Sequence, residues 1–186
     1  MGIITLIKTL TASDSASLDF VDGTSSVVLD STYDEYMFVF TDIGPATDQV
    51  QFQFQVNATD DAGGGYDSSP MTTTTWDAHS SEAEDSGAIE YQGGHDQANG
   101  TAFQRIIGGV GSDADQSCAG VVHLFNPSST TYVKHFYAHT HHNQANDHVA
   151  NYFIAGYIND TTAIDEIRFK MSSGNFDGVI QMYGIA

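Results

Sequence analysis

The most constraining feature of this sequence is a run of strict alternation at residues 49–56, where glutamines take turns with Val50, Phe52, Phe54 and Val56. Successive side chains of a β-strand point to opposite faces, so the four apolar residues share one face and the glutamines share the other. Alternation of this regularity predicts a half-buried strand in an antiparallel sheet.

The same period of two recurs along the chain. At 36–40 three aromatic residues alternate with Met37 and Val39, which predicts a strand with apolar side chains on both faces. Further strands are predicted at residues 3–7, 17–21, 104–107, 119–125, 132–140, 151–158, 167–171 and 179–185. Turn signals such as Asn126-Pro127 separate them, and no stretch has the apolar spacing of an amphipathic helix.

This pattern predicts an all-β fold. About nine short strands at this spacing favour an antiparallel β-sandwich, jelly-roll-like, with residues 1–186 forming one domain. The region 57–101 is rich in Gly, Asp, Ser and Thr, and we expect long loops there with one or two strands.

Charge excludes several classes of partner. The chain has 24 acidic residues against 5 lysines and arginines, a formal net charge of −19. Such a field repels nucleic acid and anionic membranes, so neither is an expected partner. In seawater the Debye length falls to roughly 4 Å, which removes most of the repulsion within the chain and indicates a saline setting. No apolar run reaches the length of a transmembrane helix.

Motifs of catalysis are absent from the sequence. It contains no G-x-S-x-G, P-loop or H-E-x-x-H pattern, and the glycine-rich segment 108–111 lacks the lysine of a phosphate-binding loop. We therefore expect no enzymatic activity, no catalytic residues and no cofactor. Cys118 is the single cysteine, and its small apolar neighbours predict a buried, unreactive thiol.

Two kinds of metal site are considered from the residues. If residues 132–141 form one strand, His135, His139 and His141 point to one face. His139 and His141, two positions apart, could then chelate a transition metal, with copies in a trimer completing the shell. No carboxylate or thiolate partner stands at a defined spacing, and a polar, histidine-rich edge is the alternative. The acidic clusters at 60–61, 82–85 and 113–115 could hold calcium, or could be solvated loops.

Three segments carry a resemblance to a known group of proteins. Residues 30–36 (DSTYDEY), 123–136 (HLFNPSSTTYVKHF) and 169–178 (FKMSSGNFDG) resemble small proteins encoded by tailed phages of marine bacteria, both cyanobacteria and ocean heterotrophs. The similarity extends over nearly the whole chain, although the stretch 139–142 is not part of the shared pattern. No catalytic residue comes with it.

The resemblance implies a structural protein of the virion. It would be made in the host cytoplasm, since no signal peptide opens the chain, and would lie on the exterior of the particle. A capsid decoration or cement protein, or a small neck or tail accessory protein, fits a compact chain that shows no fibre shaft. Its partners would be other virion proteins, and we expect a homo-oligomer, with a trimer favoured.

The alternative is a tail-fibre or receptor-binding tip that binds a host surface glycan or protein. Trp76 and Tyr91 stand as isolated aromatic anchors in the region expected to form loops, and they would be its ligand-binding residues. An exposed aromatic patch around these two residues would favour this second interpretation.

Overall fold

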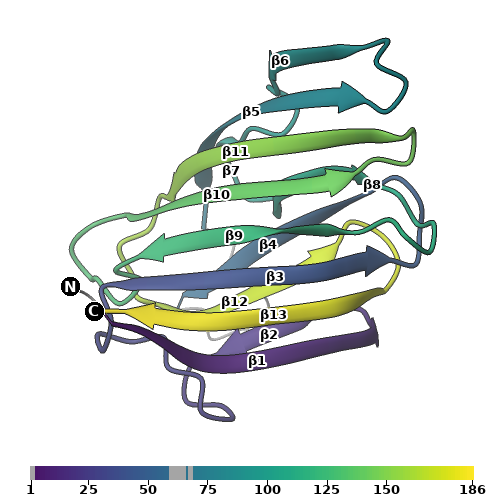
Figure 1. Ribbon diagram of the computed structural model, residues 1–186. Coiled ribbons are helices and arrows are strands. Elements are labelled where there is room, and N and C mark those ends of the chain that lie inside the picture. Colours follow the sequence, from purple (N-terminus) through teal and green to yellow (C-terminus); the bar gives the residue numbers. More distant parts are fainter. Residues whose placement is uncertain (1–2, 59–65, 67–68) are drawn as a thin grey trace.

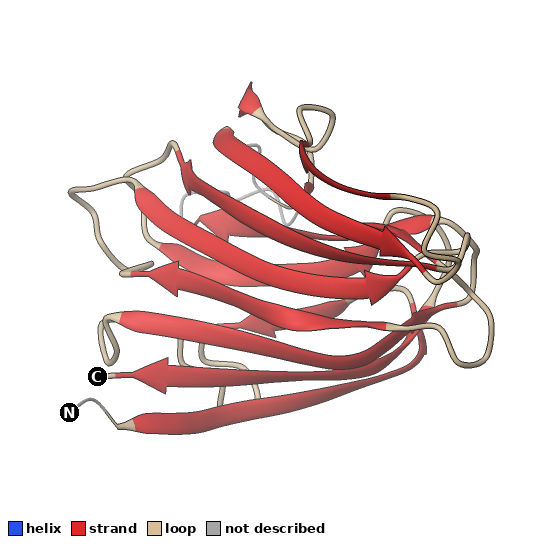
Figure 2. Ribbon diagram, turned by 45° about the horizontal axis from the view of Figure 1, so that its top comes forward, coloured by secondary structure: helices blue, strands red, loops and turns tan. Residues whose placement is uncertain are grey.

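The structure is a computed structural model that describes residues 3–58, 66 and 69–186. These residues form two antiparallel β-sheets that pack face to face in two layers, with loops gathered at both ends of the strands (Figures 1 and 2). The predicted all-β, sandwich-like architecture is confirmed. No helix that could span a membrane occurs in the described ranges.

The two sheets differ in size. In spatial order, the large sheet consists of β1 (Ile4–Ser15), β13 (Phe176–Ile185), β3 (Glu35–Pro45), β9 (Cys118–Phe125), β10 (Lys134–Asn143), β11 (His148–Ile158), β5 (Met71–Ser81) and β6 (Gly87–Tyr91), with β7 (Ala98–Gly100) also paired to β5. The small sheet consists of β2 (Leu18–Val21), β12 (Ile164–Met171), β4 (Val50–Ala58) and β8 (Gln104–Val110).

Four strand pairs are nested in the sequence, with the β4–β8 pair innermost. They are β1 with β13, β2 with β12, β3 with β9 and β4 with β8, and successive pairs alternate between the large and the small sheet. This nesting is compatible with a jelly-roll winding, and that finer class stays a prediction. The β10–β11 hairpin and β5 to β7 extend one edge of the large sheet beyond the nested pairs, at the top of Figure 1.

Alternation explains how the core is filled. In β4 the apolar residues of the 49–56 run are buried while Gln51 and Gln53 are half-buried, as predicted. In β3 Tyr36, Phe38 and Phe40 point inward, and Met37 and Val39 lie half-buried on the other face. The inward rings of both sheets meet in one aromatic cluster, in which edge-on and tilted contacts predominate.

The region 57–101 departs from the prediction. Within its described residues it supplies three strands, β5, β6 and β7, and the described chain has thirteen strands, more than the nine or so expected. The inner face of β5 is polar because amide side chains cover it, from Gln97 in the segment after β6 and from Gln104 at the start of β8. Thr73 of β5 donates a hydrogen bond to Gln104 (3.0 Å) and accepts one from the backbone of Gln97 (2.8 Å). A strand covered by amide side chains does not need apolar residues at alternate positions. The sequence of β5 is therefore similar to that of a loop.

Candidate functional site

The outer face of the large sheet is the most distinctive surface of the protein. The small sheet packs on the inner face only, and every second residue of β10 is therefore exposed, beginning at His135 and ending at Asn143. The intervening residues, among them Phe136, Thr140 and His142, are buried against the core. The prediction that His135, His139 and His141 share one face is confirmed.

Aromatic rings stack across neighbouring strands on this face. The ring of Phe153 (β11) lies between Trp76 (β5) and His139 (β10), with centroid distances of 4.3 and 4.2 Å and nearly parallel planes. One row away, His123 (β9) stacks on Tyr137 (β10) at 4.5 Å, and its Nδ1 pairs with the carboxylate of Glu35. The aromatic face is defined here by its outward rings: Trp76, His123, Phe125, His135, Tyr137, His139, Phe153 and Tyr157.

A shallow trough crosses the aromatic face over Ala155. This small residue is the cross-strand partner of both Tyr137 and Thr74, so the sheet is low between the rings of Phe153 and Tyr157, which flank Ala155 on β11. Two adjoining hollows meet there, and both are lined by Thr74, Tyr137 and Ala155. The result is an apolar trough with aromatic walls and hydroxyl groups at its side.

The four central strands of this face contribute no charged side chain to it. The four adjacent strands β9, β10, β11 and β5 contain two charged residues, Lys134 and Asp77, and both point inward and are buried. The Lys134 ammonium donates to the backbone carbonyl of Asp160 at 3.2 Å. The acidic residues that give the chain its net charge of −19 therefore lie outside these four strands, and Glu35 of β3, at the border of the aromatic face, pairs with His123.

Trp76 and Tyr91 are brought together by the sheet, and not by loops. Trp76 points outward from β5 with 42% of its surface exposed, and Tyr91 is its direct cross-strand partner on β6, 69% exposed. The Tyr91 hydroxyl donates to the carboxylate of Asp96, and this hydrogen bond raises the pKa of the phenol. Of the two predicted ligand-binding residues, Trp76 thus belongs to the aromatic face and Tyr91 lies beside it on β6.

His139 and His141 both project from this face as predicted. The His139 ring is stacked on Phe153, and its Nε2 lies 2.8 Å from the Oδ1 of Asn151. Neither histidine belongs to a group of three metal-ligating side chains in the described part of the chain. Metal binding by this pair stays a prediction.

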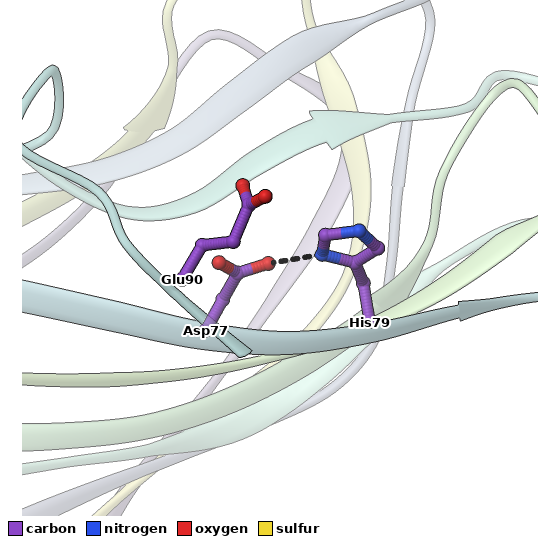
Figure 3. A group of neighbouring side chains, drawn as sticks. All are labelled: Asp77, His79 and Glu90. Atoms are coloured by element: carbon purple, nitrogen blue, oxygen red, sulfur yellow. Dashed lines mark hydrogen bonds and ion pairs between the residues drawn. The ribbon is translucent and has the colours of Figure 1, made fainter. Parts of the chain in front are cut away.

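The sequence-based search missed a cluster on the opposite side of β5. Asp77 and His79 point inward from β5, and Glu90 of β6 is the cross-strand partner of Asp77 (Figure 3). The ligand atoms of these three side chains lie within 4.8 Å of one another. The spacing of Asp77 and His79, two apart on one strand, was the available signal, but it fell in a region expected to form loops.

The structure adds little about the other residues considered from the sequence, the single cysteine and the acidic clusters. Burial raises the pKa of the Cys118 thiol, in keeping with an unreactive cysteine. Asp113 and Asp115 line a cavity together with Asp42 and Asp177, whereas the acidic pair at 60–61 lies outside the described residues.

No protein-family model, curated protein or solved structure matches the chain.

Proposed function

We propose that this protein is a non-catalytic structural component of the exterior of a phage particle, and that the aromatic face is its docking surface for neighbouring subunits. The observation that carries the proposal is an aromatic sheet face to which β9, β10, β11 and β5 contribute no charged side chain, on a chain of net charge −19. The phage context is supported by the resemblance of segments 30–36, 123–136 and 169–178.

The composition of the face fits a protein interface better than a solvated surface. The cores of protein interfaces are depleted of charged residues and enriched in Tyr, Trp, Phe and Met. A broad apolar surface on a soluble chain marks a site of interaction. Towards β1 the outer side continues with Leu6, opposite Tyr183, and with Ile4, opposite Ile185. Ile4 and Leu6 are exposed on the edge strand, so the apolar surface reaches an unpaired edge.

Self-association is expected to increase with salt. Copies of net charge −19 repel one another, and this repulsion is screened when the Debye length falls from about 10 Å in about 0.1 M salt to about 3 Å in about 1 M salt. Contacts between aromatic and apolar side chains lose little on screening, so light scattering should show the mass rise from monomer towards a homo-oligomer, with a trimer favoured. A stable monomer at high salt would contradict docking between copies.

A variant with a charge in the trough tests whether self-association uses the aromatic face. Ala155→Glu adds a carboxylate at an exposed position of the aromatic face and should keep the protein monomeric at high salt. Ala83→Glu adds the same charge in the exposed turn between β5 and β6 and should leave the association unchanged. Equal behaviour of the two variants would place the interface elsewhere.

Glycan binding is a second candidate, favoured by the trough over Ala155. Stacked rings beside hydroxyl groups suit a neutral sugar, which can lie on an aromatic ring while its hydroxyls reach Thr72 and Thr74. Trp76→Ala should abolish binding on a glycan array, because it removes one wall of the trough. Tyr132→Ala removes an exposed ring from the loop before β10 and serves as the control. Loss of binding in both variants, or in neither, would contradict this candidate.

A further inference from the structure

The Asp77–His79–Glu90 cluster has the ligand set of a metal centre. Asp77 is 1% exposed, His79 is partly exposed and Glu90 is exposed, so the three side chains run from the interior to the surface at the β5–β6 hairpin (Figure 3). The Nδ1 atom of His79 lies 3.1 Å from the Oδ2 atom of Asp77. Two ligands of a tetrahedral ion with bonds of about 2.0–2.2 Å stand about 3.3–3.6 Å apart, so this pair is within a few tenths of an ångström of the separation of neighbouring ligands.

The charges of the cluster favour a bound cation. Asp77 and Glu90 face each other directly across two antiparallel strands, and like charges in that position destabilise a sheet. The Asp77 carboxylate is also buried, where a charge is costly, and its partners among the described side chains are the amide of Gln92 and the imidazole of His79. No lysine or arginine in the described ranges forms an ion pair with either carboxylate. A divalent cation between the two acids would remove both penalties.

The surroundings of Asp77 hold it in place for ligation. Its Oδ1 atom accepts a hydrogen bond of 2.8 Å from the Nε2 of Gln92, which leaves Oδ2 directed at His79. Metal-ligating carboxylates are commonly fixed by such outer hydrogen bonds. Glu90 has no hydrogen-bond partner among the described residues other than through the backbone pairing of its strand, so its side chain is free to close on an ion.

We infer that these three side chains form a binding site for a divalent transition-metal ion, with zinc the best match. An imidazole nitrogen is a poor ligand for calcium and magnesium, which prefer oxygen, whereas zinc accepts nitrogen and carboxylate oxygen together. Three protein ligands with one exposed side leave a coordination position for water. The site is distinct from the aromatic face, because Asp77 and Trp76 point to opposite faces of β5.

The ion would fasten the edge of the large sheet. Strand β6 pairs with β5 alone and carries exposed side chains along most of its length. A metal held by Asp77 and His79 on β5 and by Glu90 on β6 crosslinks the two strands. Zinc should therefore raise the melting temperature and slow amide hydrogen exchange in β6, since a ligand that binds the folded state alone stabilises it.

The test is zinc titration of the full chain by calorimetry, with elemental analysis for stoichiometry. The expected result is one zinc ion per chain, with calcium failing to compete. Glu90→Gln, an exposed substitution that preserves shape, should weaken zinc binding by at least about tenfold, and His79→Gln should do the same. Glu82→Gln removes the same charge from the turn of this hairpin and should bind zinc as the parent does.

The outcomes separate this site from the histidine pair on the outer face. The double variant His139→Ala, His141→Ala should retain stoichiometric zinc. The inference is overturned if the parent binds no stoichiometric zinc, if Glu90→Gln and His79→Gln bind as the parent does, or if binding is lost with His139 and His141. Circular dichroism of each variant establishes that the fold is kept, and Glu90→Gln meets that condition most easily because its side chain is exposed.

Discussion

Phe169→Ala should lower the free energy of unfolding by about 3–5 kcal/mol, the cost of truncating a large buried ring and leaving a cavity. Phe169 of β12 is fully buried at the centre of the aromatic cluster between the sheets. Its ring lies 5.9 Å from Phe52 and 5.5 Å from Phe38, which belong to opposite sheets. Urea denaturation followed by circular dichroism measures the change, and an unchanged slope would show that the midpoint alone has moved.

Phe125→Ala is the matched control for this prediction. Phe125 is half-buried on the outer face of β9, where its removal opens no closed cavity. We expect a loss of about 1 kcal/mol, in the ordinary range for substitutions outside the core. Equal losses in the two variants would contradict the view that the aromatic cluster holds the two sheets together.

The strands of the core could be predicted from sequence because burial on one face leaves a period of two. The 49–56 run and the 36–40 run became β4 and β3, with the predicted residues inward. Phe169 was likewise placed on a strand, since 167–171 alternates apolar and basic residues. In each case one face of the strand packs on the apolar inner face of the opposite sheet, and this packing requires an apolar residue at every second position.

Strand β5 could not be predicted for the opposite physical reason. It carries a run of four threonines from Thr72 to Thr75 and has polar side chains on both faces. Its inner face meets Gln97 and Gln104, which form hydrogen bonds with the Thr73 hydroxyl, and its outer face meets solvent. Neither environment demands apolar residues, so the local sequence indicates a turn-rich region.

The candidate site was predictable within a strand and unpredictable between strands. The common face of His135, His139 and His141 follows from period two alone. The stack of Trp76 on Phe153 depends on β5 lying next to β11, and the contact of Asp77 with Glu90 depends on the β5–β6 register. The first pairing joins distant parts of the chain, and the second depends on the register of a hairpin, which neither strand specifies alone.

Acidification should destabilise the protein through His142, whose ring is 1% exposed and lies against Tyr152. Neither ring nitrogen makes a hydrogen bond of ordinary geometry with a described side chain or backbone group. Burial lowers the pKa of His142 to about 4, and the Gly108 backbone opposes the shift only in part. Burial also lowers the pKa of His95, which stacks on the same tyrosine.

The direction of the stability change follows from the number of protons that the folded and unfolded states bind. The unfolded chain protonates this histidine near pH 6.5, whereas the folded chain resists protonation until about pH 4. The unfolded state therefore binds more protons in this window, and the stabilisation that is complete above pH 6.5 is lost as the pH falls towards 4. The expected loss from this residue between pH 7.5 and pH 4 is about 3 kcal/mol.

Comparing the parent with a variant that lacks His142 separates this effect from that of the carboxylates, which titrate in the same pH range. His142→Leu replaces the ring by an apolar side chain of similar size, so its free energy of unfolding should fall by about 3 kcal/mol less than that of the parent on acidification. His141→Leu changes the neighbouring histidine, which points outward and is exposed, and should follow the parent. Urea denaturation at the two pH values measures both differences. Parallel pH profiles for the parent and His142→Leu would show that the buried ring is already protonated or solvated in the folded protein.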